Sequence, residues 1–295
     1  MFRIDQLVPF RIPGLSRILG PIQTEFALGR LSGQAWISTN STLFGPSIAN
    51  QPFIHIYKIS FEPTANLEFG MGISALFGGP DLPVTWKNFL RTFTTNGIPG
   101  TNSDPGDRRS TFDFSYRVPY LRNKLTIYAH SLVEDEISPL GSTRPSMQLG
   151  MHLPSVPGLP KLELRMEGLY TDVPGQLTKG FIYSNSRYAS GYTNNGALMA
   201  SWIGRQGKGG EGWATYWLSS RSNIQASFRR QVVDQVFIGG GQLNDFRLNS
   251  DVALNRSLIF GAGFQYERWQ FPVISPVVQR NLSLQVQLTV EPRWK

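Results

Sequence analysis

The sequence contains no cysteine. This absence excludes disulfides, thiolate metal sites and cysteine nucleophiles. Charged residues are also scarce, because they make up 16% of the 295 residues, whereas a typical soluble domain has about 25%. The net charge is +8, but lysine and arginine are scattered singly rather than gathered in a block. We therefore expect no nucleic-acid partner.

Long apolar runs and catalytic motifs are absent as well. No apolar run reaches the roughly 18 residues that a membrane-spanning helix needs, and Arg11, Pro13 and Arg17 interrupt the N-terminal stretch where an export signal would stand. No G-x-S-x-G nucleophile motif occurs. His55, His130 and His152 share no metal-ligand spacing. The sequence predicts no enzyme, no metal site and no cofactor.

Three polar stretches resemble ligand-binding loops, but each fits an ordinary connection better. The segment GRQGKGGEG at 204–212 lacks the Ser or Thr that follows the lysine of a phosphate-binding loop, and we interpret it as a flexible turn. The acidic run 134–136 lacks the spacing of a calcium loop and is interpreted as solvated. The segment 104–107, Asp-Pro-Gly-Asp, indicates a turn.

What the sequence does have is strand periodicity. Residues 281–291 read NLSLQVQLTVE, in which apolar residues alternate strictly with polar ones. The same alternation is clear in four further segments: 66–77, 111–118, 162–168 and 257–268. It is weaker in seven others: 22–31, 53–61, 124–131, 146–152, 213–220, 224–230 and 248–254.

The length and alternation of these segments are typical of tilted strands in an outer-membrane barrel. Charges on the polar face would be costly in a packed interior but not in a water-filled lumen. A soluble β-sandwich or propeller also alternates, although no blade-length repeat supports a propeller. We predict an all-β transmembrane antiparallel β-barrel of about 14 strands, in one domain over 1–295. Aromatic residues near strand ends are placed to form interfacial girdles: Tyr120, Tyr170, Trp202, Trp269 and Trp294.

The connections include one expected helix and several long polar loops. The segment 81–93, DLPVTWKNFLRTF, is predicted to be helical, with Asp81 as its cap and Pro83 in the first turn, and to lie across a barrel end. The long polar loops, expected to be extracellular, are 94–109, 134–145, 172–180, 184–196, 204–211 and 239–246.

Residues 183–217 combine aromatic side chains with amides and arginines. Aromatic faces stack on sugar rings, and amide and guanidinium groups hydrogen-bond hydroxyls and carboxylates. The same residues would also fit a membrane interface and a hairpin tip without any ligand. The residues concerned are Tyr183, Tyr188, Tyr192, Trp202, Trp213, Tyr216, Trp217, Asn185, Asn194, Asn195, Arg187 and Arg205.

The run 188–246, which begins YASGYTNNGALMASWIGR and ends VFIGGGQLNDF, resembles the capsule assembly proteins of the Wzi type. The segments 107–119 (DRRSTFDFSYRVP), 37–53 (ISTNSTLFGPSIANQPF) and 11–15 (RIPGL) resemble the same family in collinear order. Asn195 stands where the family turn has its second glycine. The resemblance also implies that an export signal and a first segment are missing, so that the barrel is smaller or incomplete.

The resemblance implies an outer-membrane barrel lectin that binds capsular or other surface polysaccharide and aids its assembly or attachment at the cell surface. The positive net charge would suit an acidic polysaccharide. Besides polysaccharide, outer-membrane lipid is an expected partner, and a monomer is expected. The residues that the resemblance and the composition nominate for polysaccharide binding are Tyr188, Tyr192, Asn194, Trp202, Arg205, Trp213, Arg229 and Asp245.

Two other functions stay open at this point. The first is a porin-type channel for sugars or small solutes, whose passage would be tuned by charges facing the lumen: Arg117, Glu163, Arg165, Glu167 and Arg229. The second is a membrane-embedded glycan hydrolase that uses a pair of lumen carboxylates.

Overall fold

The fold is given by a computed structural model, which describes residues 2–6, 8–37, 44–79, 82–94, 106–121, 125–134, 145–173, 180, 182–185, 187–188 and 190–291. The helices are α1 (Ser16–Leu19) and α2 (Trp86–Thr94). The strands are β1 (Phe2–Asp5), β2 (Ile22–Arg30), β3 (Ala35–Ile37), β4 (Phe44–Ser47), β5 (Phe53–Thr64), β6 (Leu67–Phe77), β7 (Asp107–Arg117), β8 (Thr126–Glu134), β9 (Ser146–Leu153), β10 (Leu162–Tyr170), β11 (Thr193–Asn194), β12 (Ala197–Leu198), β13 (Gly207–Ser219), β14 (Ser222–Val233), β15 (Gly241–Ala253), β16 (Leu258–Gln270) and β17 (Gln279–Val290).

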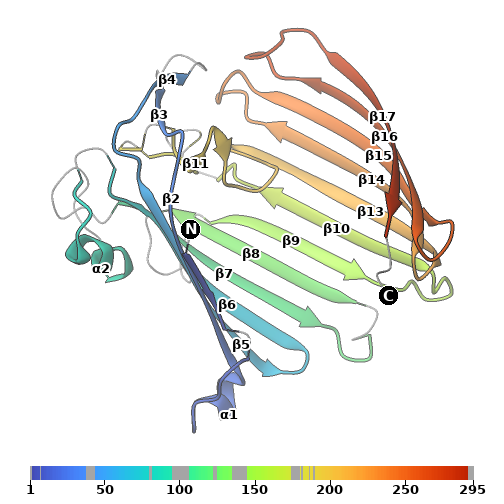
Figure 1. Ribbon diagram of the computed structural model, residues 1–295, viewed down its shortest axis with the longest axis horizontal. Helices are drawn as coiled ribbons and strands as arrows, with labels where there is room; N and C mark the ends of the chain where they lie inside the picture. Colours follow the sequence, from blue (N-terminus) through green and yellow to red (C-terminus); the bar gives the residue numbers. More distant parts are fainter. Residues whose placement is uncertain are drawn as a thin grey trace. The chain divides into compact units, whose positions relative to one another are not determined.

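Thirteen of the described strands form one sheet in the order β1-β2-β5-β6-β7-β8-β9-β10-β13-β14-β15-β16-β17 (Figure 1). The alternating segments of the sequence all fall on these strands, because period-2 alternation is what a sheet with unlike faces requires. Among the thirteen strands of this sheet, only the short β1 does not coincide with a predicted alternating segment. The chain divides into two compact units, 1–116 with 129–147 and 171–206, and 117–128 with 148–170 and 207–295.

The second unit has one apolar and one polar face. β16 and β17 pair in register, so that Phe264 lies opposite Leu284 and Gln265 lies opposite Ser283. Leu284 is 74% exposed, and the other apolar residues on this face of β17 are exposed as well. An apolar face this exposed is unfavourable in water and suits a lipid environment.

The first unit repeats this arrangement over β2, β5, β6 and β7. Tyr57 lies opposite Ile73 on the apolar face, whereas Ser74 lies opposite Arg109 on the polar face. Near the end of the strands where the longer connections 31–52, 78–106 and 171–206 emerge, described residues of the segment 171–206 pack on the polar face, where the Tyr192 ring centroid lies 4.1 Å from the Arg109 guanidinium carbon.

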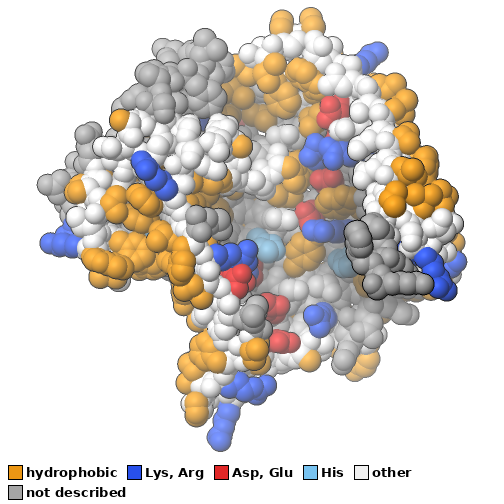
Figure 2. Space-filling model, viewed as in Figure 1, with side chains coloured by type: hydrophobic (Ala, Val, Ile, Leu, Met, Phe, Trp, Pro, Cys, Tyr) orange, Lys and Arg blue, Asp and Glu red, His pale blue; other side chains and the backbone are white. Residues whose placement is uncertain are grey.

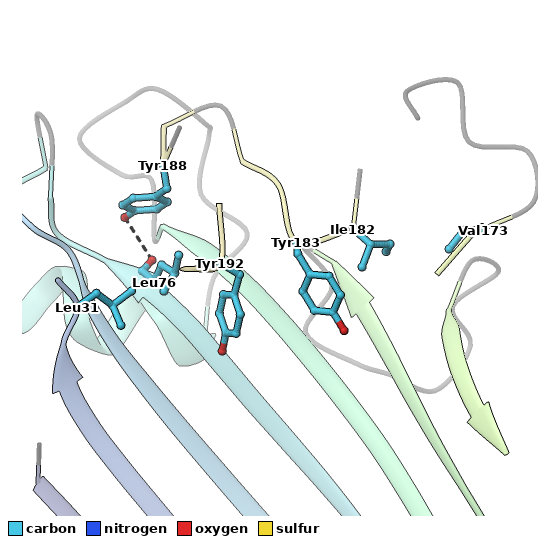
Figure 3. Close-up of a cluster of buried hydrophobic side chains, with 7 residues drawn as sticks. All are labelled: Leu31, Leu76, Val173, Ile182, Tyr183, Tyr188 and Tyr192. Atoms are coloured by element: carbon cyan, nitrogen blue, oxygen red, sulfur yellow. Dashed lines mark hydrogen bonds between the residues drawn. The ribbon is translucent and has the colours of Figure 1, made fainter. Parts of the chain in front are cut away.

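Residues of the segment 171–206 share a buried cluster with Leu31 and Leu76 of the first unit (Figure 3). The Tyr188 hydroxyl donates hydrogen bonds to the carbonyl oxygens of Leu76 (3.3 Å) and Gly78 (2.9 Å) in unit 1. Buried Gln34 donates from Nε2 to the carbonyl oxygen of Thr193 at 2.8 Å and accepts from the Ser190 hydroxyl at 2.6 Å. These bonds hold a largely irregular segment against the strands. The buried cluster consists of Leu31, Leu76, Val173, Ile182, Tyr183, Tyr188 and Tyr192.

The predicted helix exists, but its start and its place differ from the prediction. α2 begins at Trp86, and the Thr85 hydroxyl caps it by accepting a hydrogen bond from the Asn88 amide at 3.1 Å. Asp81 lies outside the described residues. The helix packs on the apolar face of β5 and β6, rather than across a barrel end, because Thr92 and Phe93 contact His55 of β5 and Phe89 contacts Phe77 of β6. Among the described residues, no helix is long and apolar enough to cross a membrane.

Several expected loops are partly strand. Residues 107–109 belong to β7, 207–211 to β13 and 241–246 to β15. The glycines at 207, 209, 210 and 212 looked like a turn because glycine weakens strand propensity, but register pairing with β10 and β14 holds them extended. Trp202 lies outside any strand, and Trp294 lies outside the described residues. The single-domain assignment stays a prediction.

The two faces of β17 give a direct test of the lipid-facing side. Leu284→Arg, on the apolar face, is expected to lower the free energy of unfolding in phospholipid vesicles by roughly 2–4 kcal/mol, whereas Ser283→Arg, on the polar face, changes it little. Denaturant titrations in vesicles measure both. Equal losses in the two variants would show that the apolar face is not the lipid face.

Candidate functional site

The polar face of the second unit is built from rows of residues that lie opposite each other across β13–β17. Register fixes each row, because every strand contributes one polar-face residue to it. The rows are Trp217–Asn223–Asp251–Gly261–Gln287, Thr215–Gln225–Asn249–Gly263–Gln285, Trp213–Ser227–Arg247–Gln265–Ser283, and Glu211–Arg229–Asp245–Glu267–Asn281.

Two tryptophans of β13 stand on this face next to β10. The Trp217 indole Nε1 donates to Oε2 of Glu163 at 2.9 Å, and His152 Nε2 lies 2.9 Å from the other oxygen of Glu163. The Trp217 residue is 37% exposed. Its ring is therefore fixed in orientation while part of it stays accessible, as stacking on a sugar requires.

Trp213 has a charged neighbour. The Arg165 guanidinium carbon lies 5.2 Å from the Trp213 ring centroid, within cation–π range. Arg165 also donates from Nε to Oε1 of Glu167 at 3.0 Å, and Tyr128 donates its hydroxyl hydrogen to the same oxygen at 2.5 Å. Gln148 Nε2 binds Oε2 of Glu167 at 2.9 Å. The arginine is thus held beside the indole by a carboxylate whose two oxygens both have partners.

Arg229 and Asp245 form the centre of a second network. Arg229 and Arg247 donate to Oδ2 of Asp245 at 2.9 Å and 2.7 Å, and Gln265 Nε2 donates to Oδ1 at 3.0 Å. The Asp245 side chain is only 2% exposed, whereas that of Arg247 is 38% exposed. Asp245 therefore positions its partners, and the arginines are the groups that a ligand can reach.

Next to these networks lies an open groove. Its volume is about 400 Å³. Gly261 and Gly263 leave its floor without side chains, and a Cβ on either would lie 3.1 Å from the side-chain oxygen of Asp251 or Asn249. Amide groups, which both donate and accept hydrogen bonds, dominate its walls. The lining residues are Asn223, Gln225, Asn249, Ser250, Asp251, Gly261, Ala262, Gly263, Gln285 and Gln287.

Charge on this face does not follow the net charge of the chain. By register and alternation, basic residues such as Arg230, Arg268 and Arg280 lie on the opposite face. Figure 2 shows acidic and basic side chains interspersed on the polar face. In the described part of β10 and β13–β17 the acidic residues on this face outnumber the basic ones: Glu163, Glu167, Glu211, Asp245, Asp251 and Glu267 against Arg165, Arg229 and Arg247. The positive net charge is thus no argument for an acidic ligand here.

The nominated residues fall into two groups. Trp213, Arg229 and Asp245 share the polar face of the second unit, as described above. Tyr188, Tyr192, Asn194, Trp202 and Arg205 belong to the segment 171–206 of the first unit. Their roles in binding stay predictions in both groups.

The two nominated tyrosines are buried. Tyr188 is 0% exposed and Tyr192 is 7% exposed, so neither ring offers an open face for stacking on a sugar. The Arg109 guanidinium carbon lies 4.1 Å from the Tyr192 ring centroid. Burial raises the pKa of Tyr192, and the nearby Arg109 charge opposes that shift. The packing of both tyrosines explains their presence without a ligand.

The other three residues of this group are partly buried. Asn194 accepts a hydrogen bond from the Ser32 amide at 2.9 Å. Arg205 donates from Nε to the carbonyl oxygen of Gly180 at 2.9 Å, and burial lowers its pKa. Trp202 follows strand β12 in the same segment. Asn194 and Arg205 therefore make bonds within the first unit, as structural residues do.

A buried charge cluster under this segment escaped the sequence analysis. Arg109 lies 2.9 Å from both Asp107 and Glu134 in ion pairs whose side chains are at most 2% exposed. The Tyr183 amide also donates to Glu134. The local sequence indicated a turn at Asp107 and a solvated loop at Glu134. It does not show that Arg109 of β7 pairs with Glu134, because Glu134 lies in another strand, β8. Both expectations were wrong, since the two carboxylates are buried.

The sequence analysis did not single out Tyr128. It named Glu163 only as a lumen charge of a channel and Trp217 only among the aromatic residues of 183–217, and it nominated neither for polysaccharide binding. Trp217 had a usable signal, since alternation along β13 puts it on the same face as Trp213 and puts Tyr216 on the other. No group of three or more potential metal-ligating residues occurs among the described residues.

The chain is similar to known outer-membrane proteins of capsule assembly. A family model described as capsule assembly protein Wzi matches residues 1–284. A protein of Klebsiella pneumoniae, an uncharacterized 55.8 kDa protein in the cps region, is 30% identical over 80 residues, which are 27% of this chain and 16% of that protein. Wzi of Escherichia coli is described as an outer-membrane protein involved in group 1 capsule assembly and as a carbohydrate-binding β-barrel. Its structure matches 99% of this chain and 61% of its own length, with a TM-score of 0.75 at 14% identity.

These findings confirm the predicted fold and family resemblance. The chain has the all-β fold of an outer-membrane β-barrel, and it spans less than two thirds of the length of either relative. A further structure, the outer-membrane channel DcaP of Acinetobacter baumannii, matches with a TM-score of 0.48 at 11% identity, covering 92% of this chain and 73% of that one. That likeness is too weak to bear on function.

The buried charge cluster predicts that loss of an arginine destabilises the protein much more at one end of β7 than at the other. Arg109→Ala leaves two buried carboxylates without their cation and is expected to cost about 3–5 kcal/mol of unfolding free energy, with faster proteolysis of the segment 171–206. Arg117→Ala removes the same charge from the exposed end of the same strand and is the control. Equal protease resistance in both variants would show that the cluster does not hold the segment.

Proposed function

Because the chain belongs to the Wzi family of capsule assembly proteins, we propose that it is an outer-membrane barrel that binds capsular or other surface polysaccharide. It retains the polymer at the cell surface and so aids its assembly or attachment. The observation that carries this proposal is the polar face of the second unit, where fixed indoles adjoin a groove lined by amides.

This face has the groups that saccharide recognition uses. Trp217 and Trp213 supply apolar ring faces for stacking. The amides of the groove pair with hydroxyl groups, which also donate and accept. The ionic groups are engaged with one another, as in the bonds of Asp245 with Arg229 and Arg247. The ligand segment bound here is therefore rich in hydroxyl groups and does not depend on an excess of charge.

Binding without bond cleavage is part of the proposal. A glycosidase needs one carboxyl group that is protonated and free to reach the glycosidic oxygen. Glu167 accepts hydrogen bonds on both oxygens, and Asp245 is held by two arginines and a glutamine. Carboxylates whose oxygens are engaged by neighbouring side chains suit positioning rather than contact with a glycosidic oxygen.

A porin-type channel is the second candidate, since a charged and hydrated polar face also suits passage of small solutes. Planar-bilayer conductance separates the two. A binding barrel whose long connections obstruct it passes little current, whereas a porin shows stable open steps. The proposal also includes two points about the surroundings of the protein. The barrel is a monomer, and outer-membrane lipid is its second partner.

The test on cells compares two faces of one strand. The parent gene is deleted and replaced by the wild type, by Trp213→Ala/Trp217→Ala on the polar face, or by Tyr216→Ala on the apolar face of β13. Each lost stacking contact is worth about 0.5–1.5 kcal/mol. We expect the double variant to bind polysaccharide fragments about tenfold more weakly and to shed polymer into the medium.

The ratio of cell-attached to released polysaccharide is the readout, with outer-membrane levels of each variant measured by immunoblot. Tyr216→Ala is expected to behave as the wild type. If deletion leaves the ratio unchanged while uptake of small solutes falls, the retention function is wrong and the channel is favoured.

The salt dependence of binding gives a separate prediction. Because the three arginines of the polar face are paired with carboxylates and the groove is lined by amides, raising ionic strength from about 0.05 M to about 0.2 M is expected to change the affinity for polysaccharide fragments less than about twofold. Isothermal titration at both salt concentrations measures this. A steep loss of affinity would instead indicate recognition of an acidic polymer by the arginines.

A further inference from the structure

Helix α2 lies on the apolar face of the first unit, a surface that polysaccharide binding does not use (Figure 1). His55 of β5 anchors it, since its Nε2 lies 2.6 Å from the Thr92 hydroxyl, which donates to the Phe89 carbonyl oxygen at 2.6 Å. Phe93 stacks on the His55 ring at 4.3 Å between centroids. A helix fastened this way is a fixed part of the apolar face.

The helix and the strands enclose a narrow apolar groove. Its volume is about 280 Å³. Phe89 forms its inner wall, packed 5.5 Å from the Phe77 ring and 5.6 Å from the Trp86 ring. Trp86 and Val84 at the rim are 78% and 55% exposed. The lining residues are Leu28, Phe53, Phe77, Val84, Thr85, Trp86 and Phe89.

The two sides of α2 differ in chemistry. Helical spacing puts Trp86, Phe89 and Phe93 on one side and Lys87 with Arg91 on the opposite side. Figure 2 shows hydrophobic side chains gathered over this region. A helix with an apolar and a basic side is typical of an element that lies in a lipid interface.

The position of α2 along the strands fits this chemistry. It belongs to the connection 78–106, which joins β6 to β7 at the end of the strands where the longer connections emerge. In outer-membrane barrels this is the extracellular end. The apolar groove continues the apolar side of β2, β5 and β6, and lipid headgroups lie at this end of the strands in an outer-membrane barrel.

We propose that α2 and the apolar ends of β2, β5 and β6 form a binding site for one membrane lipid. An acyl chain occupies the groove beside Phe89, and an anionic, phosphate-bearing headgroup extends past the exposed Trp86 at the rim, over the outer side of the helix, to Lys87 and Arg91. The charge of the helix and the continuity of the groove with the lipid-facing surface favour a lipid over a protein occupant. This site is independent of polysaccharide binding, because its residues belong to α2, β2, β5 and β6 of the first unit, whereas the groove and the tryptophans proposed to bind polysaccharide belong to the second unit.

The experiment uses the full chain, released from membranes in a neutral detergent, and native mass spectrometry. Phosphatidylglycerol and phosphatidylcholine with identical acyl chains are added in turn, so that only the headgroup charge differs. Lys87→Gln/Arg91→Gln removes the basic side of α2. Leu28→Trp fills the groove from β2. Lys161→Gln/Arg256→Gln removes two charges at the connections of the opposite strand end and is the matched control.

We expect the wild type and the control to prefer phosphatidylglycerol, by about fivefold for each basic residue in contact with the headgroup. Lys87→Gln/Arg91→Gln is expected to lose this preference while still binding both lipids. Leu28→Trp is expected to bind both more weakly, with wild-type heat-modifiable migration as the check of its folding.

Three results would overturn the proposal. These are equal binding of the two lipids by the wild type, an equal loss of preference in the control, or a dimer that Leu28→Trp abolishes. The last would assign the groove to a second copy of the chain. If the protein proves not to retain polysaccharide on cells, the proposed lipid site is unaffected, because native mass spectrometry measures lipid binding in the absence of any saccharide.

Discussion

In the described part of the chain, each interior strand of the thirteen-stranded sheet is hydrogen-bonded to a neighbour on both sides, and this constraint determines the rest of the structure. Paired antiparallel strands leave side chains as the only groups that meet the surroundings, and they do so alternately on two faces. Leu284 and Ser283 are neighbours in the chain but belong to opposite environments. A single register shift would exchange those environments along a whole strand, so the alternation fixes register together with sidedness.

The polar and apolar faces therefore present different groups and are proposed to bind different ligands. On the polar face of the second unit, register sets tryptophans, amides and paired ions side by side, and glycines at 261 and 263 open a groove between them. On the apolar face of the first unit, α2 adds a basic and aromatic element where lipid headgroups are expected. Polysaccharide binding and lipid binding are thus proposed for surfaces built from different strands and different side chains, which is why each can be altered without the other.

The segment 171–206 shows how aromatic and polar residues that look like a ligand site can instead form a core. Tyr188 is buried and bonded to backbone oxygens of β6 and its connection, and Tyr192 packs against the Arg109 guanidinium. Arg109 in turn neutralises Asp107 and Glu134. Removing water from three charges is costly, and their mutual pairing offsets that cost only in this geometry. The cluster therefore specifies one arrangement of the segment over the strands.

The sequence by itself determined the all-β class, the positions of nearly all long strands and the face on which each strand residue lies, because those follow from a local period of two. The motifs in 188–246 also determined the family. The tertiary structure decided what each face touches. Glycines at 207–212 became strand through pairing with β10 and β14, and α2 came to lie against His55. Asp107 and Glu134 became buried partners of Arg109 rather than turn and loop residues. These outcomes depend on contacts between residues distant in the chain, and the energy of burying a charge or an aromatic ring is set by those contacts and not by its neighbours in sequence.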